Sequence, residues 1–359
     1  ITLPDGRKAI RETNTMPQWA GSCWYFLRYL DPHNTQALAD KAKIEYWMPV
    51  NLYVGGAEHA VLHLLYARFW HKVMYDLGIV NTIEPFERLV NQGMITSFAY
   101  QKADGSLVPT DEVTETGPDA WVVTKTREPV QRVIAKMSKS LKNVINPDEI
   151  ITEYGADSMR LYEMFMGPLR QSKPWATQGL VGIHRFLDRV WRLTEKKLVN
   201  VEPPKDLLKL LHKTIKKVAK DTRSLDFNTA ISQMMIMVNE LYKSDELHRA
   251  IFEPFVLVLA PYAPHLAEEL WQQLGHQTSL AYEPFPQWDE ALCTDDEVTV
   301  ILQVNGKLRA EIKVARDTAG PELEKLALAN ERIAELTAGK KIIKVVVVPN
   351  RIVNVVIAG

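Results

Sequence analysis

The sequence predicts an α/β domain, followed by an α-helical bundle and a small α+β domain. Residues 50–54 form a short apolar segment that ends at Gly55-Gly56 and leads into residues with helical spacing, which is the strand, turn and helix unit of an α/β sheet. From about residue 178, apolar side chains keep a 3.6-residue period over several long segments, which indicates packed helices. Near the C-terminus, alternating segments flank Asn305-Gly306, a strong hairpin signal.

Length and composition are those of an ordinary globular chain. The 359 residues suffice for two or three domains, and 46% hydrophobic with 24% charged residues give no sign of disorder. The 43 Lys and Arg residues against 44 Asp and Glu residues give a net charge of -1. A polyanionic partner must therefore be bound by local basic patches, because the net field does not attract it.

Cysteine usage and the lack of long apolar runs predict a cytoplasmic protein. Cys23 and Cys293 are the only cysteines and lie far apart in sequence, which favours a reducing compartment over a disulfide framework. No apolar run approaches the roughly 20 residues of a membrane span, and the first ten residues lack the apolar core of a signal peptide. The chain begins at Ile1 and not at Met, which indicates a piece of something longer or a processed product.

An aromatic segment and the strand, turn and helix unit form the first candidate site. Residues 21–29 hold four aromatic side chains that either fill the core or line a pocket: Trp24, Tyr25, Phe26 and Tyr29. Glu58 falls in the first turn of the next helix, where its carboxylate can accept hydrogen bonds from ribose hydroxyls. We expect this helix over about residues 60–78, with an apolar face made of Val61, Leu64, Leu65, Phe69 and Val73.

His59 and His63 are four residues apart and share one face of that helix. The spacing suggests a metal site, but the order Glu-His-x-x-x-His differs from the His-Glu-x-x-His of zinc proteases, and no third ligand is obvious. Cys23 and His71 are no better candidates for metal ligands than these two histidines. We therefore predict no protein-bound metal.

The pentapeptide Lys136-Met137-Ser138-Lys139-Ser140 carries two lysines on a short loop. Lysine is a compact charge on a flexible stem and can follow moving phosphate oxygens, whereas the rigid fork of arginine fixes one geometry. A reaction that attacks the α-phosphorus of ATP and expels pyrophosphate develops negative charge that such cations stabilise. The loop is therefore either a solvated surface loop or a site for a leaving polyphosphate, in which Lys136 and Lys139 would be the catalytic residues.

Three further segments surround this loop. Residues 89–95 indicate a buried strand that ends in a glycine turn. Residues of about 97–135 are rich in turns with short alternating runs and form a small insertion. After the loop, Pro147 with Asp148 and Glu149 in the first turn is an N-terminal helix signal, and Asn146 can serve as its cap.

The helical region and the C-terminal region are predicted as separate domains. We expect a bundle over residues 176–289, with a fourth helix of about 247–274 bent near Pro261 and Pro264. Its Met234, Met235 and Met237 are read as core filling, and its basic runs are either a solvated face or phosphate contacts. Residues 296–359 predict a β-β-α-β-β domain with one helix of about 321–336.

The pentapeptide is the signature loop of class I aminoacyl-tRNA synthetases, and three other segments resemble the bacterial leucyl-tRNA synthetases in particular. These are the segment from Glu12 to Tyr25, the Tyr-Val-Gly-Gly-x-Glu-His-Ala-x-x-His-Leu-Leu-Tyr pattern from Tyr53, and the segment around the Asn-Gly turn at residues 302–309. The resemblance covers essentially the whole chain. It implies the second half of a class I nucleotide-binding (Rossmann-like) domain over residues 1–175, followed by an anticodon-binding-type bundle and a C-terminal tRNA-binding domain.

The resemblance also implies a role for individual residues. Residues assigned to the leucine pocket are Ser22, Tyr25, Tyr53 and His63. Those assigned to ATP are Gly56, Glu58, His59, Gln92, Met94, Lys136, Ser138 and Lys139, with residues 92–94 along the adenine. Weak candidates for phosphate contacts with tRNA are Arg189, Lys216, Lys217, Lys307, Arg309 and Lys341. The insertion at about 97–135 lies where leucyl enzymes carry a small leucine-specific insertion.

The implied activity is that of a leucine–tRNA ligase, with ATP and Mg²⁺, leucine and tRNA-Leu as partners. The chain lacks the family's His-x-Gly-His motif and its editing domain, so it is expected to hold the second half of an active site and to be inactive alone. One alternative is a non-catalytic tRNA-binding or scaffold subunit of a split enzyme, joined by a separate N-terminal half. Another is a sibling synthetase for isoleucine, valine or methionine.

Overall fold

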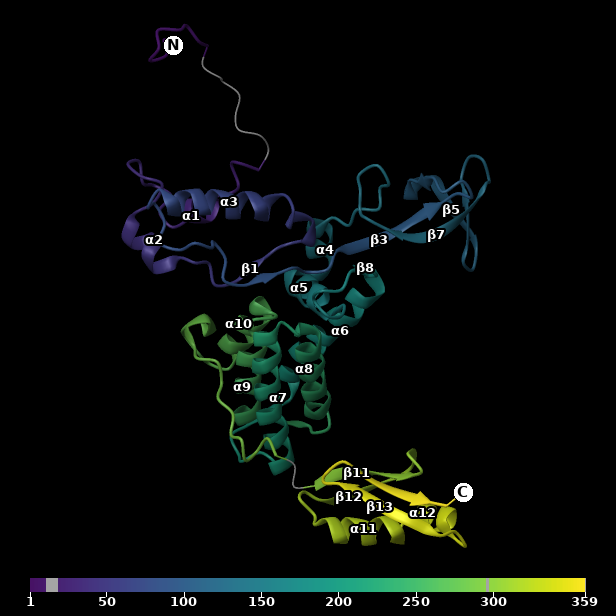
Figure 1. The fold of residues 1–359 in the computed structure, drawn as a ribbon. Helices are drawn as coiled ribbons and strands as arrows, with labels where there is room; N and C mark the ends of the chain where they lie inside the picture. Colours follow the sequence, from purple (N-terminus) through teal and green to yellow (C-terminus); the bar gives the residue numbers. More distant parts are fainter. Residues whose placement is uncertain (11–18, 295–296, 359) are drawn as a thin grey trace. The chain divides into compact units, whose positions relative to one another are not determined.

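The computed structural model describes residues 1–10, 19–294 and 297–358 (Figure 1). The start of the segment from Glu12 and the domain boundary at 296 lie outside the described residues. The chain divides into two compact units, one of residues 1–188 with 224–232 and one of 189–223 with 233–359. In the described part of the chain, no helix is both long enough and apolar enough to cross a membrane.

The first unit begins with short elements around one apolar cluster. These are α1 (Tyr25–Arg28), α2 (Lys41–Trp47), β1 (Tyr53–Val54), a 3-10 turn (Ala57–His59), α3 (His63–Asp76) and β2 (Leu89–Val90). β1 and β2 pair in parallel. Cys23, Leu27, Ile44 and Ala67 are almost fully buried in the cluster that holds these elements together.

Two expectations for this region were wrong in detail. The predicted buried strand at 50–54 is a two-residue strand, and Val54 is 53% exposed. The buried side of α3 carries His63, Ala67, His71 and Met74, whereas Val61, Leu65 and Phe69 of the predicted apolar face are exposed. Helical spacing alone does not say which side of a helix meets a partner, and here the cluster around Cys23 packs against the opposite side.

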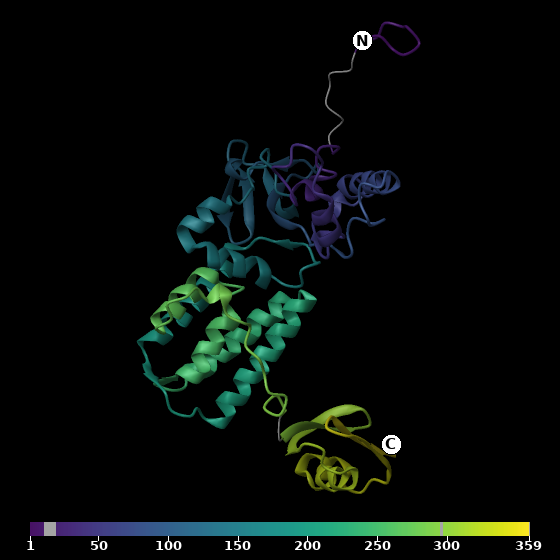
Figure 2. The same ribbon diagram turned by 90° about the vertical axis from the view of Figure 1, so that its left-hand side faces the viewer.

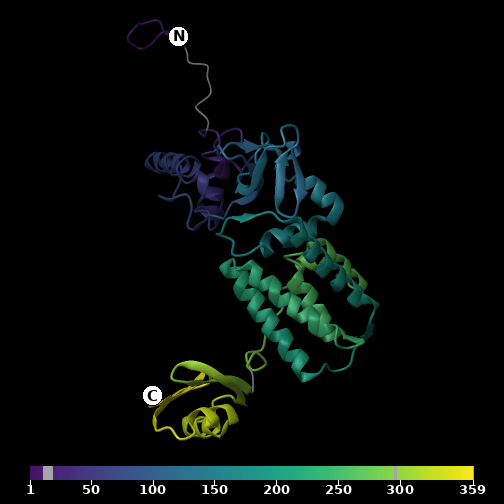
Figure 3. The same ribbon diagram turned by 90° about the vertical axis from the view of Figure 1, so that its right-hand side faces the viewer.

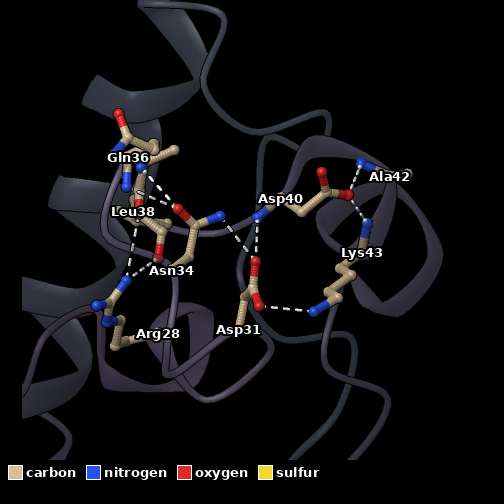
Figure 4. Close-up of polar contacts among 9 residues, drawn as sticks. Arg28, Asp31, Asn34, Gln36, Leu38, Asp40, Ala42 and Lys43 are labelled. Carbon is tan, nitrogen blue, oxygen red and sulfur yellow. Dashed lines mark hydrogen bonds and ion pairs between the residues drawn. The ribbon is translucent and has the colours of Figure 1, made fainter.

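A polar network fixes the loop between α1 and α2 (Figure 4). Asp31 accepts hydrogen bonds from Lys43 Nζ at 2.6 Å, Asn34 Nδ2 at 2.8 Å and the Asp40 amide at 3.1 Å. The bond from Lys43 is the main reason that the pKa of Asp31 is lowered to about 2. Arg28 of α1 donates to the carbonyls of residues 37 and 38. The loop is thereby tied to the short helix that carries Tyr25.

The predicted insertion is an antiparallel sheet. Its strands are β3 (Ile95–Gln101), β4 (Leu107–Val108), β5 (Val113–Gly117), β6 (Ala120–Val123) and β7 (Pro129–Ala135), in the order β4-β3-β7-β6-β5. Val108, Val123 and Val130 form its small core. Because β3 begins at Ile95, this sheet continues directly from segment 91–94.

Helices and one short strand follow the lysine loop. They are α4 (Pro147–Tyr154), α5 (Ala156–Phe165), β8 (Lys173–Pro174) and α6 (Thr177–Arg192). The predicted start of α4 is confirmed, since Pro147 is at its first position and the Asn146 side chain accepts from the Asp148 amide. β8 pairs in parallel with the start of β3, Ile95 opposite Lys173.

The second unit contains most of the predicted helices and a C-terminal α+β domain. Helices α7 (Lys205–Ser224), α8 (Phe227–Leu241), α9 (Arg249–Leu259) and α10 (Pro264–Gln273) follow the short strand β9 (Lys197–Val199), and β10 (Glu246–His248) pairs with β9 in parallel. α7, α8 and α9 lie side by side (Figure 2). Met234 and Met237 are fully buried, as expected for core filling. The single bent helix predicted at 247–274 is two helices, because Pro264 starts a new helix.

The C-terminal domain has a four-stranded sheet with two helices on one face (Figure 3). Its elements are β11 (Glu297–Val304), β12 (Lys307–Ala315), α11 (Gly320–Ala329), α12 (Glu331–Thr337), β13 (Ile342–Val348) and β14 (Ile352–Ile357). The Asn305-Gly306 hairpin is confirmed, with φ of 49° and 77°. The predicted single helix at 321–336 is two, because Asn330 leaves the helical region (ψ 127°) and caps α12.

Candidate functional site

An aromatic cavity of about 280 Å³ lies between α1, β1 and α3 in the first unit. Its walls include Tyr25, Tyr53 and His63, which were predicted for leucine, and Trp19, which was not. Ser22, Gly56 and His59 also line it. The cavity therefore brings together all four residues predicted for leucine, together with two of those predicted for ATP.

Three polar side chains form a hydrogen-bonded chain in this cavity. The hydroxyl oxygens of Tyr25 and Tyr53 are 2.8 Å apart, and the Tyr53 oxygen is 2.6 Å from Nε2 of His63. Burial and the neighbouring His59 lower the pKa of His63, while burial raises the pKa of Tyr53. Both groups are thus neutral near pH 7, and the cavity offers an uncharged wall to an aliphatic ligand.

Packing fixes the tyrosine at the centre of this chain. The ring of Tyr53 stacks on Phe86 with centroids 3.8 Å apart and 13° between the planes. Tyr53 also lies in register with Leu89 of β2. Its hydroxyl is consequently held at a fixed point between Tyr25 and His63.

A second cavity, of about 410 Å³, adjoins the first. The two share Val54 and Gly56 as lining residues, so they meet at these two residues. The second cavity has polar side chains from Glu58, Gln92, Glu163 and Lys173. Its apolar walls come from Met94, Met164, Met166 and Leu169.

Gly93 is required where the backbone segments around the second cavity meet. A Cβ atom at Gly93 would overlap the carbonyl group of Gln171 and lie 2.5 Å from the Ser172 nitrogen. The Gly93 amide donates to the Leu169 carbonyl at 2.8 Å. Residues 169–173 therefore form a floor directly beneath segment 92–94.

The lysine loop begins beside the second cavity. Ala135 at the end of β7 lies opposite Ser97 of β3, two residues beyond the cavity-lining Ile95. Asn143 holds the loop, since its side chain accepts from the Ser138 amide at 2.9 Å and donates to the Phe98 carbonyl at 3.3 Å. Ala135, the residue before the loop, thus lies opposite a residue two positions along β3 from one that lines the polar cavity.

The lysines of this loop differ in their partners. Lys142 is paired with Asp111 at 2.5 Å. Lys136 and Lys139 are exposed, neither lines the two cavities, and in the part of the chain that the structure describes neither makes an ion pair or side-chain hydrogen bond. Their ammonium groups are free to approach phosphate oxygens.

The six basic residues predicted for tRNA lie in two settings in the second unit. Arg189 donates to Asn239, Lys216 pairs with Glu290 and Lys217 pairs with Asp221. Lys307, Arg309 and Lys341 are exposed on the C-terminal domain. The last three are therefore the more accessible candidates for phosphate contacts.

Sequence reasoning missed Trp19, Glu163 and Lys173 as cavity residues. Trp19 lies within the segment that carries the family resemblance, and its ring meets His59 edge-on at 5.4 Å. Glu163 and Lys173 reach the cavity from α5 and β8, far along the chain from Gln92. No spacing in the sequence could have joined these two to the site. Within the described residues, no cluster of three or more His, Cys, Asp or Glu side chains is arranged to hold a metal ion.

Two family models match the chain. Residues 133–173 match tRNA synthetases class I (I, L, M and V), and residues 204–326 match the anticodon-binding domain of tRNA ligase. The first match covers the lysine loop and the floor of the second cavity. Fold and site together define a part of a class I aminoacyl-tRNA synthetase.

Individual relatives narrow this class. The leucine–tRNA ligase of Borreliella burgdorferi (strain ZS7) is 57% identical over 97% of this chain and 41% of that protein, and the one of Borrelia duttonii (strain Ly) is 56% identical over 98% and 42%. The structure of Agrobacterium radiobacter K84 agnB2 LeuRS, in a ternary complex with tRNA and LeuAMS, covers 100% of this chain and 45% of its own with a TM-score of 0.76 and 29% identity. The chain belongs to the leucine–tRNA ligase family and spans about two fifths of the length of these curated relatives.

Proposed function

We propose that this chain provides the lysine-loop half of the active site of a leucine–tRNA ligase. In the complete enzyme, the leucine carboxylate attacks the α-phosphorus of ATP, the bond between that phosphorus and the bridging oxygen breaks, and diphosphate leaves. A hydroxyl of the terminal ribose of tRNA-Leu then attacks the carbonyl carbon of leucyl-adenylate, and AMP leaves.

The observation that supports this proposal is the pair of adjoining cavities. An aminoacyl-adenylate is an elongated molecule with an aliphatic end, a phosphate and a nucleoside. The aromatic cavity suits the leucine side chain, and the polar cavity with its methionine walls suits the nucleoside. Val54 and Gly56, which line both cavities, lie where the phosphate link between the two ends would pass.

The lysines act on the first step. Negative charge develops on the departing diphosphate, and cations aimed at it lower the barrier. Lys136 and Lys139 are unpaired and their loop begins at the edge of the polar cavity, so each can approach the β- and γ-phosphates when ATP is bound. Glu58, at the junction side of the same cavity, accepts hydrogen bonds from the ribose hydroxyls. Mg²⁺ would enter with the ATP phosphates, because it usually keeps substrate oxygens and water as most of its ligands.

Leucine is favoured by shape and not by a polar contact. Tyr53 and His63 are neutral near pH 7 and offer no charge of their own to attract a polar side chain. A cavity of this kind separates near-isosteric aliphatic side chains by only about 1–3 kcal/mol. Isoleucine, valine and methionine are therefore the competitors to measure.

Leucine-dependent exchange of pyrophosphate into ATP tests the proposal. The chain is assayed alone and after joining to the remaining part of a curated relative. We expect exchange with leucine in the joined protein, and much weaker exchange with isoleucine, valine or methionine. Exchange driven best by one of those three would assign the chain to a sibling enzyme.

A non-catalytic tRNA-binding or scaffold subunit is the second candidate. It is favoured by the exposed basic side chains of Lys307, Arg309 and Lys341 on the C-terminal domain. Appreciable exchange by the chain alone would contradict it. Binding of tRNA by the chain alone, with exchange restored only by the missing part, would support it.

A further inference from the structure

Three backbone polar groups beneath the second cavity are already hydrogen-bonded within the chain. The Gly93 amide donates to the Leu169 carbonyl at 2.8 Å, the Met94 amide donates to Ser172 Oγ at 3.1 Å, and the Met94 carbonyl accepts from the Lys173 amide at 3.0 Å. These three groups are occupied by residues 169–173. At these three groups no backbone donor or acceptor is left unpaired, so the side chains of the cavity are the groups that we consider for recognition of a base edge.

Glu163 is an acceptor side chain of this cavity that can perform that task. It lines the second cavity from α5, and burial raises its pKa. Among the described residues it has no ion pair or hydrogen bond, whereas Lys173 in the same cavity donates to the Gly167 carbonyl at 2.8 Å. A carboxylate in the last turn of a helix also faces the negative end of the helix dipole. A half-buried, unpaired carboxylate at this position costs stability unless a ligand satisfies it.

The walls of the cavity suit a purine. Met94, Met164 and Met166 offer flexible apolar surfaces to the faces of a flat ring. With the aliphatic end of an aminoacyl-adenylate in the aromatic cavity and its phosphate at Val54 and Gly56, the base reaches the part of the space that Glu163 lines.

We propose that Glu163 determines the base specificity of the nucleotide site, by accepting a hydrogen bond from the 6-amino group of adenine. Guanine carries a carbonyl oxygen at that position, which would face the carboxylate without a proton between them. Glu163 thereby favours ATP over GTP. This inference rests on the proposed function, because it requires the nucleotide to bind in the second cavity.

The test compares three nucleotides in leucine-dependent pyrophosphate exchange, using the chain joined to the remaining part of a relative. They are ATP, GTP and purine riboside triphosphate, which lacks the 6-amino group. The variants are Glu163→Met, which removes the acceptor, and Glu163→Gln, whose amide can donate to a carbonyl. Glu115→Gln is the matched control, since Glu115 is an exposed glutamate on β5 outside both cavities.

For Glu163→Met we expect kcat/KM for ATP to fall roughly 10- to 100-fold, the effect of losing a charged hydrogen bond, while the value for purine riboside triphosphate is unchanged. Glu163→Gln should lower the ratio of kcat/KM for ATP to kcat/KM for GTP about tenfold or more. Glu115→Gln should change neither kcat/KM for ATP nor its ratio to the value for GTP. An equal loss with all three nucleotides would show a merely structural role and overturn the proposal.

The two proposals fail in different ways. If the unaltered joined protein shows no leucine-dependent exchange, the proposed function is overturned, and this inference with it. In the other case, the joined protein is active while both Glu163 variants keep its ratios of kcat/KM among the three nucleotides. Only the role of Glu163 is then overturned. Should Glu163→Met not fold, the ratio measured for the near-isosteric Glu163→Gln decides alone.

Discussion

The hydroxyl oxygen of Tyr53 lies 2.6 Å from Nε2 of His63 and 2.8 Å from the hydroxyl oxygen of Tyr25. Replacing Tyr53 by Phe removes the middle of this chain and leaves two partly buried polar groups without their partner. We expect stability to fall by about 1–3 kcal/mol and the KM for leucine to rise in the complete enzyme. Thermal unfolding and pyrophosphate exchange measure the two effects.

Tyr75→Phe is the control for this change, because Tyr75 lies on the same helix as His63 and is 42% exposed. Tyr75→Phe should leave both the stability and the KM for leucine unchanged. An unaltered leucine KM in Tyr53→Phe would contradict the assignment of the aromatic cavity to leucine.

Stability should depend on pH through His63. Its pKa is lowered in the folded protein by burial and by His59, so the unfolded chain binds the proton more readily. Stability should therefore be complete above the ordinary histidine pKa of about 6.5 and fall as the pH drops below it, by at most about 1.4 kcal/mol per pH unit for one proton. His71, whose pKa is also lowered by burial, adds to the same trend.

Calorimetric unfolding from neutral to mildly acidic pH checks this dependence. The slope of the unfolding free energy against pH should be smaller in His63→Gln than in the unaltered chain. It should be unchanged in His33→Gln, since His33 is exposed. Equal slopes in all three would mean that His63 is not a buried neutral imidazole.

Lys139→Ala should abolish most of the exchange activity of the complete enzyme and leave tRNA affinity nearly unchanged. The loss should be of the order of 10²- to 10³-fold, as for other groups that stabilise transition-state charge. Lys142→Ala is the matched control from the same loop, because its ammonium is paired with Asp111. A collapse of tRNA binding in Lys139→Ala would show that the loop has another role.

Gly93→Ala should destabilise the first unit. The new methyl group would overlap backbone atoms of Gln171, and relieving such an overlap costs about 1–3 kcal/mol or more. Gly182→Ala is the contrasting change, because Gly182 lies in α6 with no atom within 4 Å of the added Cβ. It should stabilise the chain by about 0.5–1 kcal/mol. Denaturant unfolding measures both effects. The free energy of unfolding should be lower for Gly93→Ala and higher for Gly182→Ala than for the unaltered chain.

Local signals in the sequence were reliable where neighbours in the chain decide the structure. The cap at Asn146, the hairpin at Asn305-Gly306 and the buried Met234 and Met237 follow from turn chemistry and helical period. Errors arose where a distant partner decides. The period of α3 was visible, but its buried side depends on which side meets the cluster around Cys23.

The family was determined by the sequence alone, and the central residues of the candidate site were predicted from it. The lysine pentapeptide and the glycine and histidine pattern at 53–66 are contiguous motifs, and short contiguous motifs can be read without knowledge of the fold. Tertiary structure alone decided that Glu163 and Lys173 share a cavity with Gln92, and that Ala135 stands opposite Ser97. These relationships depend on strand register and on the close approach of Gly93 to Gln171, which join segments separated by tens of residues.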